Sequence, residues 1–304
     1  MKSLNTKVFA AITLLMASSV FGFAQTRSFE HDLSPFEGIE ATDGFKVSVS
    51  KSDGYSAKLT VDDALESYVQ CYVKAGVLHI GLDDKAIPKD LKKQYKGRNS
   101  SEPTLVAVVR IPELKTLLLS DDCKFFSSSE IAASELSMTL TGSASANNLK
   151  ITGKTFNLTV SKNAKFTNAS VTVEGDLGVT CDSKGIVTLE YKANNLKVTS
   201  SGSAEMDIRG DAEEKVSIDA SGSSKTTLSG SSKAFEVTGK GTSAKVAASA
   251  LETLSATITA TGISVETNAS DNLELDLGRG TEVIFAGNPA INIIKIQAAT
   301  VTRK

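Results

Sequence analysis

Three pairs of adjacent carboxylates are the first residues in this chain that could do acid–base or metal chemistry: Asp62-Asp63, Asp83-Asp84 and Asp121-Asp122. Adjacent residues of a strand point to opposite faces, so none of these pairs is a ready-made acid–base dyad. Asp121-Asp122 also precedes Gly142 by 20 to 21 residues, in a column of turn residues described below. We therefore expect a turn at Asp121-Asp122 rather than a calcium site.

A second charged set alternates along one predicted strand and its neighbours: Glu205, Asp207 and Arg209, with Thr188, Glu190, Lys225 and Thr227 beside them. Polysaccharide lyases and hydrolases built on parallel β-solenoids gather acids and bases on one face. Mixed charges are, however, ordinary on a solvent-facing strand. The chain also lacks a nucleophile elbow, a phosphate-binding loop and a glycine-aspartate calcium repeat. We predict no catalytic residue, no cofactor and no metal site.

Three cysteines, Cys71, Cys123 and Cys181, are an odd number, so at least one thiol is unpaired in a monomer. Cys71 and Cys181 alternate with apolar residues, which predicts that they are buried as small hydrophobic side chains. Cys123 lies between Asp122 and Lys124, and its role stays open. The cysteines do not have the spacing of metal ligands, and the histidines are His31 and His79.

One short pattern returns eight times at intervals of 19 to 21 residues, and this period predicts stacked repeats. Each unit has three apolar or small residues at alternate positions, which indicates a strand. The eight triples are Leu136/Met138/Leu140, Phe156/Leu158/Val160, Leu177/Val179/Cys181, Leu196/Val198/Ser200, Val216/Ile218/Ala220, Phe235/Val237/Gly239, Leu254/Ala256/Ile258 and Leu273/Leu275/Leu277.

A column of turn residues follows the triples. Two coils carry Lys162-Asn163 and Asp182-Ser183 at this place, and the others carry glycine: Gly142, Gly202, Gly222, Gly241, Gly262 and Gly280. Glycine, Asn and Asp tolerate positive φ, which a corner that bends the same way in every coil requires. We predict an all-β fold, a parallel β-helix-like solenoid with about 19–21 residues per coil, over residues 114–304.

Residues 25–113 do not share the repeat and predict a small capping region rich in β-hairpins. Asp53-Gly54 follows the strand pattern of Phe45, Val47 and Val49 and predicts a hairpin with residues 57–61. Residues 69–73 and 78–82, joined by Ala75-Gly76, predict a second hairpin. Residues 83–103 are charged and read as a mobile loop, and 105–111 as a strand. Pro289 and the strand 291–296 are placed to blunt the far end of the solenoid.

Residues 1–24 have the pattern of a cleaved signal peptide: Lys2 and Lys7, an apolar stretch from Val8 to Val20, and small residues at Gly22 and Ala24. The remaining chain has a net charge of −4, because two lysines and no acid are removed. It therefore lacks the basic field that nucleic acid attracts. No further apolar run is long enough to span a membrane. We expect an exported protein of the periplasm, the outer-membrane surface or the medium.

Sugar recognition usually uses exposed aromatic rings, and these are scarce here. The chain has no Trp, and Phe156 and Phe235 belong to the inward triples. Tyr191 is the best outward candidate in the solenoid, and the capping region adds Tyr55, Tyr68, Tyr72 and Tyr95. A shallow polar groove of Ser, Thr and Asn is a second way to bind a glycan.

The capping region and the repeats together resemble the bacterial family named putative auto-transporter adhesin, head GIN domain. The residues that carry the resemblance, over roughly 36–286, are Phe36-Glu37-Gly38-Ile39, Phe45 to Val49, Leu78-His79-Ile80, Val108 to Leu114, and the Ser-Gly-Ser corners at Gly142, Gly202 and Gly222. The resemblance implies a secreted or envelope protein of the Bacteroidetes group with a β-helix-like fold. It transfers no site residues. Only about 15 residues follow the last repeat, so we expect no C-terminal membrane barrel.

The leading hypothesis is therefore an exported, non-enzymatic β-solenoid that presents a surface to a glycan or a cell-surface protein, either as an adhesin or as an envelope component. The alternative is a polysaccharide-binding or polysaccharide-processing protein. A third is a scaffold that stacks end to end. The sequence does not fix the oligomeric state or the ligand.

Overall fold

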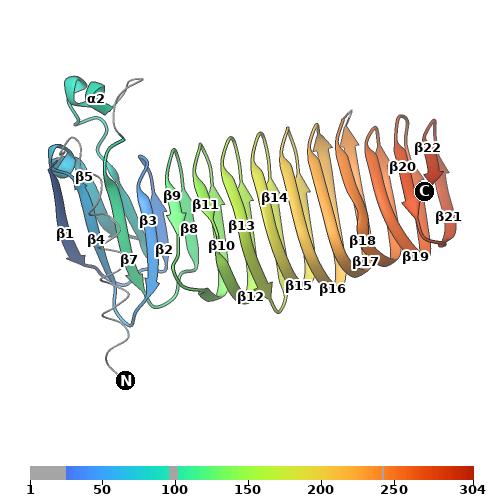
Figure 1. The fold of residues 1–304 in the computed structure, drawn as a ribbon, viewed down its shortest axis with the longest axis horizontal. Coiled ribbons are helices and arrows are strands. Elements are labelled where there is room, and N and C mark those ends of the chain that lie inside the picture. The colour runs from blue at the N-terminus through green and yellow to red at the C-terminus, as the bar shows by residue number, and fades with distance from the viewer. Residues whose placement is uncertain (1–24, 96–101, 242) are drawn as a thin grey trace.

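The computed structural model describes residues 25–95, 102–241 and 243–304, and these form an elongated β-solenoid of about nine turns (Figure 1). The predicted fold class is confirmed. The signal peptide predicted at residues 1–24 lies outside the described residues. Among the described residues, no helix has the length and apolar character needed to cross a membrane.

The described residues of the first part of the chain form seven strands and two short helices. Their bounds are β1 (Thr26–Asp32), β2 (Gly38–Ala41), β3 (Lys46–Lys51), β4 (Ser56–Asp62), η1, a 3-10 helix (Asp63–Tyr68), β5 (Val69–Lys74), β6 (Val77–Leu82), α2 (Lys89–Tyr95) and β7 (Leu105–Ile111).

The rest of the chain is built from strands that stack in parallel. Their bounds are β8 (Thr116–Leu119), β9 (Lys124–Phe126), β10 (Ile131–Leu140), β11 (Ser145–Asn147), β12 (Lys150–Val160), β13 (Lys165–Val173), β14 (Asp176–Cys181), β15 (Ile186–Ser200), β16 (Glu205–Gly222), β17 (Lys225–Gly241), β18 (Lys245–Thr261), β19 (Ser264–Leu277), β20 (Glu282–Ala286), β21 (Ala290–Ile296) and β22 (Thr300–Arg303).

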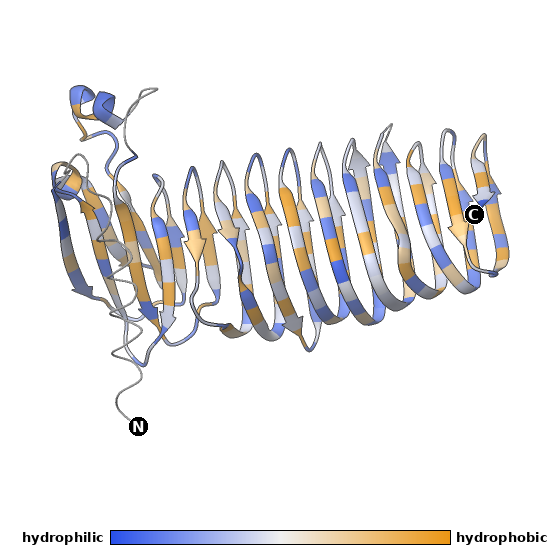
Figure 2. Ribbon diagram, viewed as in Figure 1, coloured by the Kyte–Doolittle hydropathy of each residue, from blue (hydrophilic) through white to orange (hydrophobic). Residues whose placement is uncertain are grey.

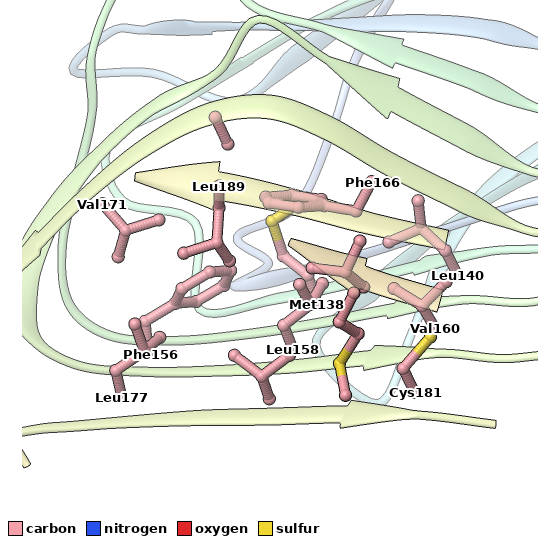
Figure 3. Packing of buried hydrophobic residues seen from close by; sticks show 14 of the residues in the cluster. Met138, Leu140, Phe156, Leu158, Val160, Phe166, Val171, Leu177, Cys181 and Leu189 are labelled. Atoms are coloured by element: carbon pink, nitrogen blue, oxygen red, sulfur yellow. The ribbon is translucent and has the colours of Figure 1, made fainter. Parts of the chain in front are cut away.

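The apolar triples form the core, as their alternation predicts. Met138 pairs with Leu158 and Leu158 with Val179, so each coil lays its inward residues on those of the last. The opposite wall contributes Phe166, whose ring centre lies 6.2 Å from that of Phe156 (Figure 3). The alternation of apolar and polar residues along each strand is visible in Figure 2. A coil cannot bury its apolar face alone, so neighbouring coils stabilise one another.

One triple is placed wrongly by the sequence. Leu254 is half exposed (50 %), and Phe235 pairs instead with Ala256, which makes Ala256, Ile258 and Ala260 the inward residues. The reason is a longer coil with an irregularity between Thr253 and Ser255. The next coil is correspondingly shorter: Ile258 pairs with Leu275, only 17 residues on.

The corners use positive φ where the glycine column predicts a bend. Gly142, Gly202, Gly222, Gly262 and Gly280 have φ between +67° and +75°. In the two coils without glycine, the positive φ falls on Lys162 and Ser183. The corner geometry expected of Gly241 is not observed, because this residue extends β17, paired with Gly222, without a positive φ. A Cβ there would lie 3.1 Å from the Gly222 oxygen, so tight stacking rather than φ favours glycine.

The capping region is partly continuous with the solenoid. One sheet runs in the order β5–β6–β2–β8 and the other in the order β1–β4–β7–β3–β9. The strands β2, β3, β6 and β7 pair in parallel like the later coils, whereas β1, β4 and β5 are antiparallel to their neighbours. The parallel ladder thus begins before residue 114.

Of the two predicted hairpins, the one between β5 and β6 is confirmed, with positive φ at both Ala75 and Gly76, as a type I′ turn requires. The hairpin predicted at Asp53-Gly54 is wrong, because β7 lies between β3 and β4. The β7 strand is apolar almost throughout and buried on both faces, which favours a central position. The loop predicted at 83–103 contains the helix α2, which starts after Pro88; residues 96–101 lie outside the described residues.

Candidate functional site

The charged set on β16 forms ion pairs. Arg209 donates from Nε and Nη2 to the two carboxylate oxygens of Asp207, at 3.1 and 2.6 Å. The hydrogen bond to Asp207 raises the pKa of the guanidinium. Glu205 lies 3.6 Å from the Nζ of Lys225 in the next coil. Paired, exposed charges of this kind do not form a convergent acid–base site.

Two of the three aspartate pairs reach one groove, which is lined by Asp84, Asp121 and Asp122 together with Lys92 and Lys124. Asp62 is buried and accepts a hydrogen bond from the Thr104 amide, whereas Asp63 forms an ion pair with Arg27. Asp121 occupies a corner with φ +55°, in the column that continues with Gly142. Among the described residues, no group of three or more His, Cys, Asp or Glu side chains could hold a metal ion.

The cysteines are free and lie wholly or partly inside the fold. Cys123 and Cys181 are buried, and Cys71 is half-buried. Burial raises the pKa of the thiols to about 11 for Cys71 and about 12 for Cys123 and Cys181. A thiol reacts as the thiolate, and burial disfavours this form. We therefore interpret the three cysteines as packing residues. Cys123, whose role the sequence left open, lies in the core.

The structure changes which of the aromatic candidates are exposed. Tyr191, expected to point outward, is only 6 % exposed and packs in the core, where burial raises the pKa of its phenol. The reason is that Tyr191 follows the inward Leu189 by two residues on β15 and pairs with Val171. Among the tyrosines, Tyr72 is instead the exposed one, at 46 %. It stacks on His79 at 5.1 Å, and His79 Nδ1 lies 3.0 Å from Glu40 Oε2.

A line of threonines is the most regular feature of the surface. In the sheet that carries the triples, the outward residues that face one another from coil to coil are Thr139, Thr159, Thr180, Thr199, Asp219, Thr238 and Thr259. We call these seven residues the threonine ladder. Successive rungs lie about 4.8 Å apart, as paired strands do. The ladder is thus a straight row of hydroxyl groups, interrupted once by a carboxylate.

The threonine ladder continues into the capping region. Thr139 pairs with Leu118, Leu118 with Glu40, Glu40 with His79, and His79 with Tyr72. The exposed ring and the His79–Glu40 pair therefore stand at one end of the same line. Sequence reasoning missed the ladder, although a signal was present: each threonine lies between the last two inward residues of its coil.

Two grooves follow the coils on other sides of the solenoid. The larger groove has a volume of about 930 Å³ and lies where each coil turns back toward the sheet that carries the triples. Its lining includes Thr152, Thr172, Lys154, Lys192 and Glu174. The smaller, of about 490 Å³, is lined by Asn148, Asn168, Thr188, Asp207 and Arg209 with their neighbours. In the smaller groove the Asn168 amide nitrogen of the main chain donates to Thr188 Oγ1 at 3.0 Å.

One solved structure has a similar fold. A structure from Parabacteroides distasonis described as a putative adhesin is 19 % identical, with a TM-score of 0.52, and the match covers 93 % of this chain and 98 % of that one. A second, from Parabacteroides merdae and also described as a putative adhesin, is 17 % identical with a TM-score of 0.46 and the same coverage. At 19 % identity, the likeness to the first structure shows the fold alone. No curated protein matches the chain.

The family comparison covers most of the chain. Residues 35–187 and 148–289 both match the family described as "Putative auto-transporter adhesin, head GIN domain". The two matches overlap within the repeats, as a periodic array permits. They confirm the resemblance that the strand order and the Ser-Gly-Ser corners indicate. The chain belongs to this family, putative auto-transporter adhesin, head GIN domain.

Proposed function

We propose that the protein is an exported, non-enzymatic adhesin that uses the threonine ladder as its contact surface for a glycan or a cell-surface protein. The observation that carries this proposal is the ladder itself: one outward column of hydroxyl groups, aligned over the coils of a rigid solenoid. Export rests on the predicted signal peptide at residues 1–24, and adhesion on the family.

The chemistry of the threonine ladder suits a polyhydroxylated ligand. A hydroxyl group both donates and accepts hydrogen bonds, as the hydroxyl groups of a sugar do. Threonine is stiff about χ1, so little side-chain entropy is lost when a ligand binds. Tyr72, at the end of the line, adds an exposed ring of the kind that sugars contact. Many weak contacts along a row favour an extended ligand over a small one.

The test compares two threonines on opposite sheets. Thr199 lies in the middle of the threonine ladder, and Thr227 faces outward from the other sheet, where it pairs with Asp207. Both are half-buried. We expect Thr199→Lys to weaken binding to a glycan array or to cells at least about tenfold, the effect of about 1.4 kcal/mol. Thr227→Lys should leave binding unchanged. A folded protein that binds neither glycans nor cells would remove the proposal.

The smaller groove favours a second candidate, a polysaccharide-binding or polysaccharide-processing protein. Its lining combines two asparagines, a threonine and an Arg209–Asp207 pair, and such polar groups fix the orientation of a ligand. On this hypothesis Arg209→Ala, and not Thr199→Lys, abolishes binding. Release of reducing ends from a polysaccharide would identify a processing enzyme. Protease treatment of intact cells distinguishes a surface location, where the chain is digested, from a periplasmic one.

A further inference from the structure

The strand at the C-terminal end of the solenoid is unlike every other strand of the repeats. All seven residues of β21 are exposed, including Ile291, Ile293, Ile294 and Ile296 at 47, 57, 61 and 39 %. Three of these side chains belong to the core columns, because Ile291, Ile293 and Ile296 pair with the buried Leu273, Leu275 and Leu277. In the part of the chain that the structure describes, β21 pairs only with β19, so its other edge is open.

We propose that this edge binds a second copy of the chain, with β21 of the two copies paired antiparallel about a two-fold axis. An exposed apolar edge of this kind is a ready template for another strand. Four of the seven residues of this edge are isoleucine and a fifth is alanine. A second copy is therefore the occupant whose apolar residues match it best, since the two ends cover each other.

The sequence of β21 is symmetrical in the way that such an axis requires. The sequence Ile-Asn-Ile-Ile-Lys-Ile has its centre at the peptide bond between Ile293 and Ile294. Read outward from this bond, the order of apolar and polar residues is the same in both directions. A two-fold interface pairs residue i with j and j with i. Ile291 would face Ile296 of the copy, both in core columns, and Asn292 would face Lys295, both outward. The irregularity at Ile294 falls on the axis itself.

Charge also favours this arrangement. Asn292 Nδ2 donates to Glu274 Oε2 at 3.0 Å, so a carboxylate lies beside the position that Lys295 of the copy would face. Directly opposed residues of an antiparallel pair are about 5 Å apart at Cβ, and diagonal neighbours remain within reach of a long side chain. Each copy would thus contribute one Lys295 and one Glu274, and the interface would contain the contact twice.

A head-to-tail arrangement is disfavoured by the other end of the molecule. In the same sheet, the far edge is β5, whose inward residues Val69, Cys71 and Val73 already pack partly against the core. Binding there would bury less apolar surface than binding to a second β21. A head-to-tail contact would also generate open polymers rather than a closed dimer.

The experiment measures the mass of the purified protein by light scattering over a range of concentrations. We expect a concentration-dependent dimer, which Ile293→Lys converts to a monomer. Leu254→Lys, which replaces an equally exposed apolar residue away from the end, should leave the dimer intact. Lys295→Glu or Glu274→Lys alone should weaken the dimer, and the double variant should restore it. A monomer at all concentrations, open-ended polymers, or a dimer that ignores Ile293→Lys would overturn the proposal.

Disulfide formation tests the register of the two β21 strands. Antiparallel partners have Cα atoms about 4.5–5.5 Å apart, which suits a disulfide. A mixture of Asn292→Cys and Lys295→Cys chains should form a disulfide-linked heterodimer on oxidation, and neither chain alone should do so to the same extent. Cross-linking of each variant to itself, with none between them, would contradict the two-fold axis at residues 293 and 294.

Discussion

In the described part of the chain, each end of the solenoid has strand edges without a neighbouring strand, and the two ends differ in the residues on these edges. At the N-terminal end the chain reverses, so the edge strands β1 and β5 run antiparallel to their neighbours. The outermost strand β1 is rich in charge, with Arg27, Glu30 and Asp32, and Arg27 is held by Asp63 and Glu66. At the C-terminal end β21 and β22 stop in parallel register, and β21 exposes four isoleucines. Both ends are visible at opposite extremes of Figure 2.

The difference between the ends teaches where a partner can add. Charged residues on an edge strand oppose pairing with another chain, and an apolar edge favours it. The inward columns are alike over the whole length, so the coils do not explain the contrast; the residues of the terminal strands do. We infer that the N-terminal end is closed by its own sequence and that the C-terminal end is open to a partner.

The largest expected effect comes from deleting β1, the charged edge strand at the N-terminal end. Deletion of residues 25–32 would expose the edge of β4, which pairs with β1 over seven residues and carries the buried Leu59 and Val61. We expect loss of soluble monomer and a rise in thioflavin T fluorescence. Deletion of residues 300–304 at the other end is the comparison: β22 pairs with β20 over four residues only and Val301 packs partly against the core, so we expect a smaller loss there. Equal solubility of the two truncated proteins would show that charge on β1 does not protect the edge.

A substitution in the middle tests whether the coils transmit stability between the ends. Gly222 has φ +70°, and a Cβ there would lie 2.8 Å from the Gly202 oxygen. A β-branched residue at positive φ is strained, so Gly222→Val should lower the free energy of unfolding by about 1–3 kcal/mol. Gly54→Val is the control, because Gly54 has an ordinary φ and a Cβ there would have no atom within 4 Å. Urea unfolding measures both. If both variants melt alike, the corner model is wrong.

Much of the fold could be predicted because a repeat states the same information many times. A period near 20 residues with three alternating inward positions indicates stacked coils that contain strands. The errors fall where a coil departs from the average. Leu254 is apolar and at the expected spacing. The coil is longer there, however, so Phe235 pairs with Ala256 and Leu254 does not take the inward position. Tyr191 shows the converse: its inward position follows from Leu189, not from its polar hydroxyl group.

The capping region and the candidate site were less predictable for a physical reason. The pairing of β3 with β7 joins residues about 60 positions apart, and a local turn signal such as Asp53-Gly54 carries no information on such a partner. The threonine ladder is also a property of register, which aligns Thr139 with Thr159 and Thr180 across coils. Threonine favours strands wherever they face solvent, so each residue alone looks ordinary. Only the alignment makes a surface.

A smaller effect is expected from the ion pairs that fasten β1. Arg27 Nε lies 2.5 Å from Asp63 Oδ1 and 3.4 Å from Glu66 Oε2, and the three side chains are well exposed. Exposed pairs of this kind contribute about 0.2–1 kcal/mol. Arg27→Ala should therefore lower the free energy of unfolding by that amount. The double variant with Asp63→Ala should cost less than the sum of the two single changes. Strict additivity would mean that the pair contributes nothing to the N-terminal end.

The smallest expected effect lies near the open end and depends on pH. The hydrogen bond from Lys245 lowers the pKa of Glu266, and the two charges are 3.1 Å apart. A carboxyl group whose pKa is lower in the folded state stabilises the protein at neutral pH, and this contribution is lost as the pH falls through about 4 toward the folded-state pKa. Glu266→Gln should therefore lower Tm slightly at pH 7 and not at pH 3. An equal difference in Tm at both values would show that Glu266 acts through packing, and the open end would then gain no stability from this charge.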